Sequence, residues 1–186
     1  FWIGGLSGLF QLRKDGKMKQ ILEGDISALF QDSRGIVYVG YVGYVSNGFH
    51  IIDLENNITK YPTAADTADY SVTNPVVARV TAFAEDENYK IWIGSKNCLN
   101  RFDPIEKTFK QYYNRVDGGG TYTAITSNIS DILLDKNDNI WLGTETGITV
   151  MTPNKEEKDS FDFELIVNFP GDTSSLSYNK VYTLQE

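Results

Sequence analysis

Residues 90–113 read KIWIGSKNCLNRFDPIEKTFKQYY, in which an apolar and aromatic run ends at Gly94 and a second apolar run follows almost at once. The nine residues around that glycine recur, with variation, at three other places in the 186-residue chain. The four copies are FWIGGLSGL (1–9), VYVGYVGYV (37–45), IWIGSKNCL (91–99) and IWLGTETGI (140–148). Their key glycines, Gly4, Gly40, Gly94 and Gly143, stand 36, 54 and 49 residues apart. Repetition on this scale indicates that one structural unit is used several times.

A second pattern precedes three of these copies at a fixed distance. It reads ISALFQD, VTAFAED and ISDILLD, and it closes on the acids Asp32, Asp86 and Asp135. Each acid lies six residues before the aromatic residue of the copy that follows, which is Tyr38, Trp92 or Trp141. This offset stays constant while the length of the whole repeat varies, so the two patterns belong to one unit.

Each unit reads as four short strands. The first, as in ISDILLD, is apolar on both faces, and a polar turn rich in Asp, Asn and Gly joins it to the second, as in IWLG. A third strand such as CLNRFD and a more polar fourth strand such as TFKQYY complete the unit. Four antiparallel strands in about 40–50 residues are typical of a β-propeller blade. A two-sheet sandwich is the competing architecture, but it would not keep the fixed offset.

One blade cannot bury both of its faces alone, so neighbouring blades must pack face to face. We expect four aromatic side chains to fill the space between blades, each burying about 150–250 Å². They are Trp2, Tyr38, Trp92 and Trp141. The key glycine lies two residues after each of them and would let the adjacent blade approach closely.

The predicted fold class is therefore all-β, with propeller blades of four antiparallel strands forming a section of a larger propeller. The blade copies are expected at about 1–23 (partial), 24–75, 76–125, 126–175 and 176–186 (partial). The tail NKVYTLQE matches the start of the first-strand pattern, and the head FWIGG begins just before the aromatic residue of a second strand. Tail and head could join and close a ring of four. We favour a section of a longer propeller, with exposed sheet faces or a partner at its open ends.

Composition excludes several classes of protein. The net charge of −8 argues against a nucleic-acid or anionic-membrane surface, since both require clustered Lys and Arg. No apolar run approaches the roughly 18 residues that suggest a membrane span. The single cysteine, Cys98, cannot form an internal disulfide and is too few for a cysteine-based zinc site.

Few residues are candidates for catalysis. The only histidine, His50, lies in the apolar stretch GFHIIDL, where a packed or edge histidine is favoured over a catalytic one. The stretch DKNDN (135–139) spaces its oxygens as a calcium loop does, but it lacks the following glycine and the distant glutamate. We predict no catalytic residue, no metal site and no cofactor. The recurring acids are expected to accept hydrogen bonds from backbone N–H groups of their turns.

A binding site is expected on one face of the blades. The turn between second and third strands lies on the same face as the loop to the next blade, around the mouth of the propeller channel. Aromatic rings stack on sugar C–H faces, and Arg, Lys and Asn bind hydroxyls or acidic groups, so the mixture found here suits an oligosaccharide. The candidate ligand residues are Tyr41, Tyr44, Asn47, Lys96, Asn97, Arg115, Tyr122 and Glu145. The same face adds Tyr70, Asn74, Arg79, Tyr113 and Thr144.

The stretches IWIGSKNCLNRFDP, NISDILLDKNDNIWLGTETGI and SLSYNKVYTLQE together resemble the two-component regulator propeller repeat. The matching positions are Trp92, Gly94, Leu99 and 101–104, then Trp141, Gly143, Thr144 and Gly147, and finally Ser175, Leu176, Ser177 and Asn179. The second copy departs from the pattern, because it carries an insertion and Tyr38 replaces Trp. Cys98 also stands where Gly8 and Gly147 sit in their turns.

The resemblance implies the periplasmic sensing region of a hybrid two-component histidine kinase of the kind found in gut Bacteroides. In that family, paired seven-bladed propellers precede a β-sandwich and a membrane span. It implies a non-enzymatic sensor that recognises an oligosaccharide and passes the signal to a kinase outside this chain. The expected partners are that ligand, the other propeller and sandwich domains of the parent chain, and a second copy as a homodimer. Neither nucleic acid nor direct membrane contact is expected.

Two alternatives stay open at this point. One is a structural propeller that binds a protein through the same face. The other is an enzyme similar to the streptogramin lyases, which use a metal and a catalytic histidine. That role would fall to His50 alone.

Overall fold

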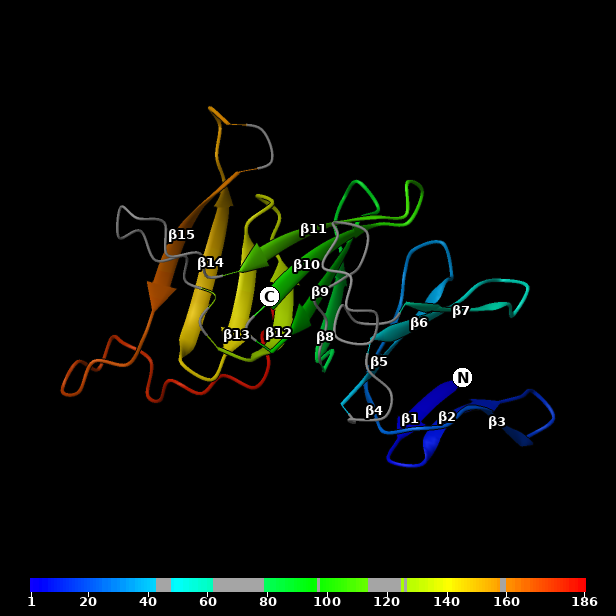
Figure 1. Cartoon of the computed structure of the whole chain (residues 1–186). Helices are drawn as coiled ribbons and strands as arrows, with labels where there is room; N and C mark the ends of the chain where they lie inside the picture. Colours follow the sequence, from blue (N-terminus) through cyan, green and yellow to red (C-terminus); the bar gives the residue numbers. More distant parts are fainter. Residues whose placement is uncertain (43–47, 62–78, 97, 114–124, 126, 158–159) are drawn as a thin grey trace.

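The computed structural model spans residues 1–186, and the structure describes all of them except 43–47, 62–78, 97, 114–124, 126 and 158–159. Within the described residues, fifteen strands form four separate antiparallel sheets (Figure 1). The predicted all-β fold, built of blade-like sheets, is therefore confirmed. Among the same residues there is no helix long and apolar enough to span a lipid bilayer.

Three of the sheets have four strands, and the first has three. The first sheet contains β1 (Trp2–Gly5), β2 (Gly8–Leu12) and β3 (Met18–Leu22). The second contains β4 (Ile26–Gln31), β5 (Val37–Tyr41), β6 (Phe49–Ile52) and β7 (Ile58–Tyr61). The third contains β8 (Ala82–Glu85), β9 (Ile91–Ser95), β10 (Cys98–Asp103) and β11 (Thr108–Tyr113). The fourth contains β12 (Ile129–Leu134), β13 (Ile140–Thr144), β14 (Gly147–Pro153) and β15 (Phe161–Ile166).

Every sheet follows the order of the sequence, so each strand pairs with the one before it and the one after it. The ISALFQD, VTAFAED and ISDILLD patterns fall on β4, β8 and β12, and the glycine-containing copies fall on β1, β5, β9 and β13. The first sheet has three strands because β1 corresponds to the second strand of the other blades. The limits of the blades between the sheets stay a prediction, because the long links at 62–78 and 114–124 lie outside the described residues.

Successive sheets lie side by side, and their first strands adjoin (Figure 1). Strand β4 contacts both β1 and β8, and β8 in turn contacts β12. The inner edges of the sheets therefore gather on one side of the molecule, as they do around the axis of a propeller.

The constant offset of six residues has a hydrogen-bonding cause. Trp141 Nε1 donates to Asp135 Oδ2 at 2.9 Å, and the backbone N–H groups of Asn137 and Asn139 donate to Asp135 Oδ1 at 2.9 and 3.0 Å. Asp86 repeats this arrangement, accepting from Trp92 Nε1 at 3.0 Å and from the backbone two and four residues onward. In the second blade, Asp32 accepts from the Tyr38 hydroxyl and from two backbone N–H groups.

The predicted backbone role of the three acids is therefore confirmed. The additional bond to the aromatic ring explains why the spacing does not vary: the acid joins the turn to the side chain that packs between blades. Hydrogen bonds from Trp141 and Asn139 lower the pKa of Asp135 from its ordinary 3.8 to about 2.

Each key glycine makes room for a β-branched side chain of the next blade. The pairs are Gly4 with Ile26, Gly40 with Val80, Gly94 with Ile129, and Gly143 with Val181. A Cβ atom on these glycines would lie only 2.6, 2.7, 2.8 and 3.0 Å from a side-chain carbon of the partner. Because the partner branches at its own Cβ, it cannot swing clear. Close approach of two sheets therefore requires glycine here.

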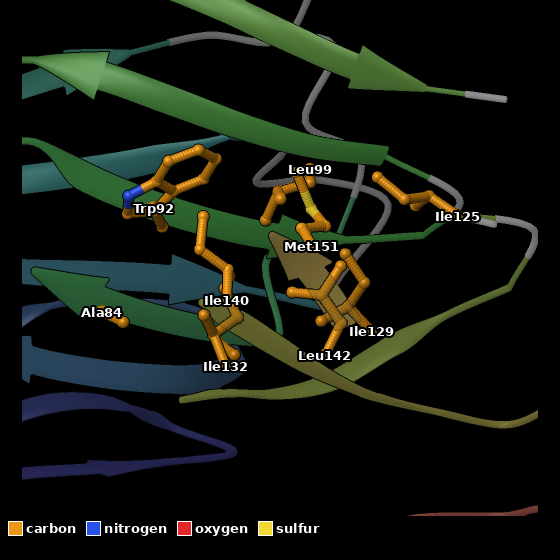
Figure 2. Packing of buried hydrophobic residues seen from close by; sticks show 10 residues of the cluster. Ala84, Trp92, Leu99, Ile125, Ile129, Ile132, Ile140, Leu142 and Met151 are labelled. Carbon is orange, nitrogen blue, oxygen red and sulfur yellow. The ribbon is translucent and has the colours of Figure 1, made fainter. Parts of the chain in front are cut away.

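The space between the third and fourth sheets is filled by a shared apolar cluster, which Figure 2 shows. Trp92 is 2% exposed, and its ring centroid lies 5.3 Å from that of Tyr112 in its own blade and 5.8 Å from that of Phe161 in the next. Between the second and third sheets, buried Tyr38 packs against Phe83 at 5.9 Å. Aromatic residues from the repeat thus join these three blades.

The two other tryptophans are half-buried. Trp2 packs against the apolar cluster of the second blade. Trp141 lies in a hollow of about 340 Å³ together with Leu133, Ile148 and Leu184. This hollow is on the side of the fourth blade that faces away from the third.

The tail follows the path of a further first strand, although it forms no regular strand. Val181 N donates to Thr144 O at 2.9 Å, and Ser130 Oγ donates to Val181 O at 2.5 Å. Thr183 Oγ1 and Leu184 N both donate to Asp131 Oδ2 at 2.8 Å. The tail therefore docks on the fourth blade much as β12 docks on the third.

Replacing Gly94 by alanine should lower the free energy of unfolding by about 1–3 kcal/mol, because the new methyl group would overlap Ile129. Urea unfolding followed by tryptophan fluorescence measures the change. Gly5→Ala is the matched control, since a Cβ there meets no atom within 4 Å. Equal effects of the two substitutions would contradict the tight contact between blades.

The lowered pKa of Asp135 predicts a specific acid sensitivity. Its carboxylate stabilises the fold fully above the unfolded-state pKa of about 4, and this contribution is lost as the pH falls towards 2. Asp135→Asn should therefore destabilise the protein at pH 7 and flatten the fall in stability between about pH 4 and 2. Asp138→Asn, in the same turn, should leave that fall unchanged. Unfolding curves at several pH values test both variants, and identical profiles would refute the assignment.

Candidate functional site

A cavity of about 280 Å³ lies where the second strands end and the first strands begin. Its lining comes from the second, third and fourth blades and from the tail. The lining residues are Val42, Arg79, Thr81, Lys96, Asn128, Ile129, Ser130, Glu145, Lys180 and Val181.

These residues occupy equivalent positions in successive repeats. Val42, Lys96 and Glu145 each lie two residues after a key glycine, and we call them the turn ring. Four residues come directly before a β-branched residue that fills the space above a key glycine. Three of them, Arg79, Asn128 and Lys180, line the cavity, and we call these three the entry ring; the fourth, Asp25, is not among the lining residues. Two rings of equivalent positions at the inner edge of the sheets are what the mouth of a propeller channel consists of. The cavity therefore belongs to that mouth.

Buried hydroxyl groups fix the turns that carry Lys96 and Glu145. Thr144 Oγ1 donates to Gly147 O at 2.9 Å and accepts from Thr146 N at 3.1 Å, and the side chain of Thr144 is 1% exposed. Ser95 occupies the same place in the third blade and donates to Cys98 O at 2.9 Å. Lys96 and Glu145 thus each directly follow a residue whose buried hydroxyl donates to a backbone carbonyl.

The entry ring is tied to the neighbouring turns through the backbone. Arg79 has a positive φ of 66°, and its Nε donates to Val42 O at 3.3 Å. The backbones of Lys96 and Asn128 pair as an isolated antiparallel bridge. The walls of the cavity are therefore connected from one blade to the next.

The floor of the cavity is apolar. Ile129 is fully buried, and Val181 lies beside it. The hydroxyls of Thr81 and Ser130 point at this floor but are already bonded, to the carbonyl oxygens of Ile129 and Val181 respectively. Polar recognition in the cavity therefore depends on the two rings, and the floor offers apolar contact.

Charge in the cavity is unbalanced. Arg79, Lys96 and Lys180 supply three cations, and Glu145 supplies one carboxylate. Within the part of the chain that the structure describes, the two ion pairs lie elsewhere, at Arg34–Asp32 and Lys90–Asp103. The Lys180 ammonium lies 5.1 Å from the centroid of the Tyr182 ring, a cation–π contact.

The structure brings two of the predicted ligand residues, Lys96 and Glu145, together in this cavity, and both are exposed. Arg79, expected on the same face, joins them. Five other candidates, Tyr44, Asn47, Asn97, Arg115 and Tyr122, lie outside the described residues, as do Tyr70 and Asn74.

Tyr41 was predicted to lie in the turn between the second and third strands, with its ring available to a ligand, and the structure places it elsewhere. It ends β5, a strand buried along its whole length, and its side chain is 1% exposed. Its ring packs edge-on against His50 at 5.1 Å, and burial raises its pKa to about 12. The prediction that Tyr41 presents its ring on the surface is therefore wrong, because the strand continues to the residue where a turn was expected.

Sequence reasoning missed the apolar lining residues Val42, Ile129 and Val181 and four polar ones: Thr81, Asn128, Ser130 and Lys180. A signal for two of them was present, since Ser27, Thr81 and Ser130 share the second place of the first-strand pattern. Ser27 Oγ donates to Val80 O just as Thr81 and Ser130 donate to the next blade. A hydroxyl recurring once per blade indicates a repeated contact between blades.

His50 does not line the cavity. It lies on β6, where burial, with a further contribution from the charge of Lys60, lowers its pKa to about 4. Its imidazole is therefore neutral near pH 7. Among the described residues, no three side chains of His, Cys, Asp or Glu are grouped to hold a metal ion.

Comparison with known families gives one match. The sequence profile described as two component regulator propeller matches residues 124–146, which include β12, β13 and the turn bearing Glu145. A search of curated proteins found no match.

Several solved structures share the fold. The extracellular domain of a protein named as the hybrid two component system BT4673 from B. thetaiotaomicron matches 98% of this chain and 22% of its own, at 20% identity and a TM-score of 0.73. The extracellular domain of BT3049 from the same organism is also similar. The match covers 97% of this chain and 22% of that domain, at 19% identity and a TM-score of 0.64. Virginiamycin B lyase from Staphylococcus aureus matches as well. The match covers 94% of this chain and 53% of the lyase, at 18% identity and a TM-score of 0.62.

The chain thus spans about a fifth of the length of the two extracellular domains and about half of the lyase. It is a propeller section similar in fold to the extracellular domains of hybrid two-component systems. At these identities the likeness shows the fold alone, and lyase propellers share that fold.

Thr144→Val should lower the free energy of unfolding by about 1–3 kcal/mol, because it removes the buried hydrogen bond to the Gly147 carbonyl and the part-buried one from the N–H of Thr146. Thr152→Val, at an exposed position of β14, provides the control and should be close to neutral. Thermal unfolding of both variants measures the difference. If Thr144→Val were also neutral, the hydroxyl would not be what holds the turn.

Proposed function

We propose that this chain is part of the periplasmic, ligand-sensing propeller of a hybrid two-component regulator. In this role it recognises an oligosaccharide and passes the signal to a histidine kinase outside this chain. The likeness to the extracellular domains of BT4673 and BT3049 supports the sensor role, and the match of residues 124–146 agrees with it. The observation that carries the proposal is the cavity at the channel mouth, where the two charged rings meet an apolar floor.

The chemistry of the cavity suits a sugar. Glu145 accepts hydrogen bonds from hydroxyl groups, and Asn128 both donates and accepts them. The half-buried side chain of Val181, on the floor of the cavity, provides apolar contact for the C–H face of a sugar ring. The volume of about 280 Å³ is near the lower end of small-molecule sites, so one part of an oligosaccharide fits while the remainder extends outward.

Signal transfer follows from how the cavity is assembled. Its walls come from separate blades and from the tail, and hydrogen bonds such as those from Arg79 to Val42 O and from Val181 N to Thr144 O link these parts. A ligand that contacts several of them binds one relative arrangement of the blades better than others. It therefore shifts the population towards that arrangement, which following domains can detect.

We do not propose catalysis. The fold shared with virginiamycin B lyase raises that question, but His50 lies on β6 and away from the cavity. A protein-binding propeller is the second candidate, because the hollow beside Trp141 offers apolar surface at the end of the fourth blade.

Titration calorimetry of the complete extracytoplasmic region with a panel of neutral and acidic oligosaccharides tests the proposal. At least one saccharide should bind, and Asn128→Ala should weaken that binding about tenfold through lost hydrogen bonds. Asn137→Ala, in an exposed turn on the opposite edge, is the matched control and should bind as the parent does. An absence of heat across the panel would favour the protein-binding alternative.

A further inference from the structure

We propose that the cavity at the channel mouth selects an acidic saccharide, and that the sugar's carboxylate is bound by Arg79, Lys96 and Lys180. This inference rests on the proposed sensor function and adds the class of ligand. It depends on the charges of the two rings and on the surroundings in which those charges lie.

The residues that line the cavity carry more positive than negative charge, whereas the chain as a whole is acidic. The chain carries 17 Lys and Arg against 25 Asp and Glu, a net charge of −8. Among the described residues that line the cavity the balance is reversed, with three cations to one carboxylate. A local excess of the minority charge in a hollow favours ligands of the opposite sign, because the walls of low dielectric concentrate the field there.

The three cations come from different parts of the fold. Arg79 precedes the third blade, Lys96 follows its second strand, and Lys180 belongs to the tail. They are far apart in sequence, so they are not one solvated charge run along a single strand. The propeller geometry brings them together, since all three occupy ring positions.

The surroundings favour pairing with an anion. The cations border an apolar floor made by Ile129 and Val181, and no carboxylate within the described segments forms an ion pair with them. A carboxylate placed there gains charge-assisted hydrogen bonds in a partly desolvated site. Arg79 adds a planar guanidinium, which matches the geometry of a carboxylate better than that of a single hydroxyl.

Glu145 limits the charge of the ligand. It stands in the turn ring at the position equivalent to Lys96, on the next blade. Its carboxylate accepts hydrogen bonds from hydroxyl groups and repels a second acidic group. The cavity therefore fits a sugar that carries one carboxylate beside free hydroxyls, which describes a uronic acid, better than a polyanion.

Two probes test the inference: galacturonic acid, which carries one carboxylate, and its methyl ester, in which that group is uncharged. Calorimetry on the complete extracytoplasmic region should give at least about tenfold tighter binding of the acid than of the ester. Lys96→Gln should weaken binding of the acid about tenfold and binding of the ester less than about twofold. Lys136→Gln, in the exposed turn at the opposite edge, is the charge-matched control and should change neither. Glu145→Gln should strengthen binding of the acid.

The outcomes separate this inference from the sensor function. Equal binding of acid and ester, or binding of only neutral saccharides from the panel, would overturn the acidic ligand while leaving an oligosaccharide sensor. Equal effects of Lys96→Gln and Lys136→Gln on the acid would also overturn it, since attraction would then be unspecific. No binding of any saccharide would overturn both. If Lys96→Gln did not fold, Lys180→Gln would serve with the same expectation.

Discussion

Neighbouring blades approach closely because a β-branched side chain, at or just before the start of an inner strand or in the tail, fills the space above a glycine of the preceding blade. The contact recurs four times, from Gly4 and Ile26 to Gly143 and Val181. It sets the separation of the sheets, and the rings of Tyr38 and Trp92 then fill the volume that this separation leaves. The hydrogen bond between the acid and the aromatic residue orients those rings, so the turn and the packing between blades are linked in the same way in both repeats.

The same contact also places the candidate site. Two residues in each repeat take their position from this contact. They are the residue before the β-branched side chain and the residue two positions after the glycine, and both lie at the inner end of the sheets. Arg79, Asn128 and Lys180 therefore face Val42, Lys96 and Glu145 across one cavity. Functional variation can occur at these positions without loss of the fold, because the glycine, the β-branched residue and the hydroxyl between blades carry the packing. Because different residues pack the blades and line the cavity, charged side chains can stand above an apolar floor.

Much of this could be predicted from the sequence, because its strongest signals are local. The spacing from Asp135 to Trp141 reflects a hydrogen bond within one turn, and the glycines mark where neighbouring blades approach closely. Both signals are visible in the sequence, so the sequence alone was enough to locate the blades. Lys96 and Glu145 were found because their positions are counted from those glycines. Tyr41 was misplaced because its strand runs one residue further than the pattern shows. Thr81, Asn128 and Lys180 were missed because they line a cavity formed by parts of the chain that are far apart in sequence, as the hydrogen bond from Thr81 to Ile129 O shows.

The central claim is that the glycine and the β-branched side chain act as one unit between blades. A double-mutant cycle on Gly40 and Val80 measures it most directly, by chemical unfolding of the parent, Gly40→Ala, Val80→Gly and the double variant. We expect strong non-additivity, with Gly40→Ala costing much less stability once Val80 has lost its side chain, because the two Val80 carbons that would lie 2.7 and 2.8 Å from the new methyl group are then absent. Additive effects would mean that the two residues do not compete for the same space, and they would refute the proposed contact.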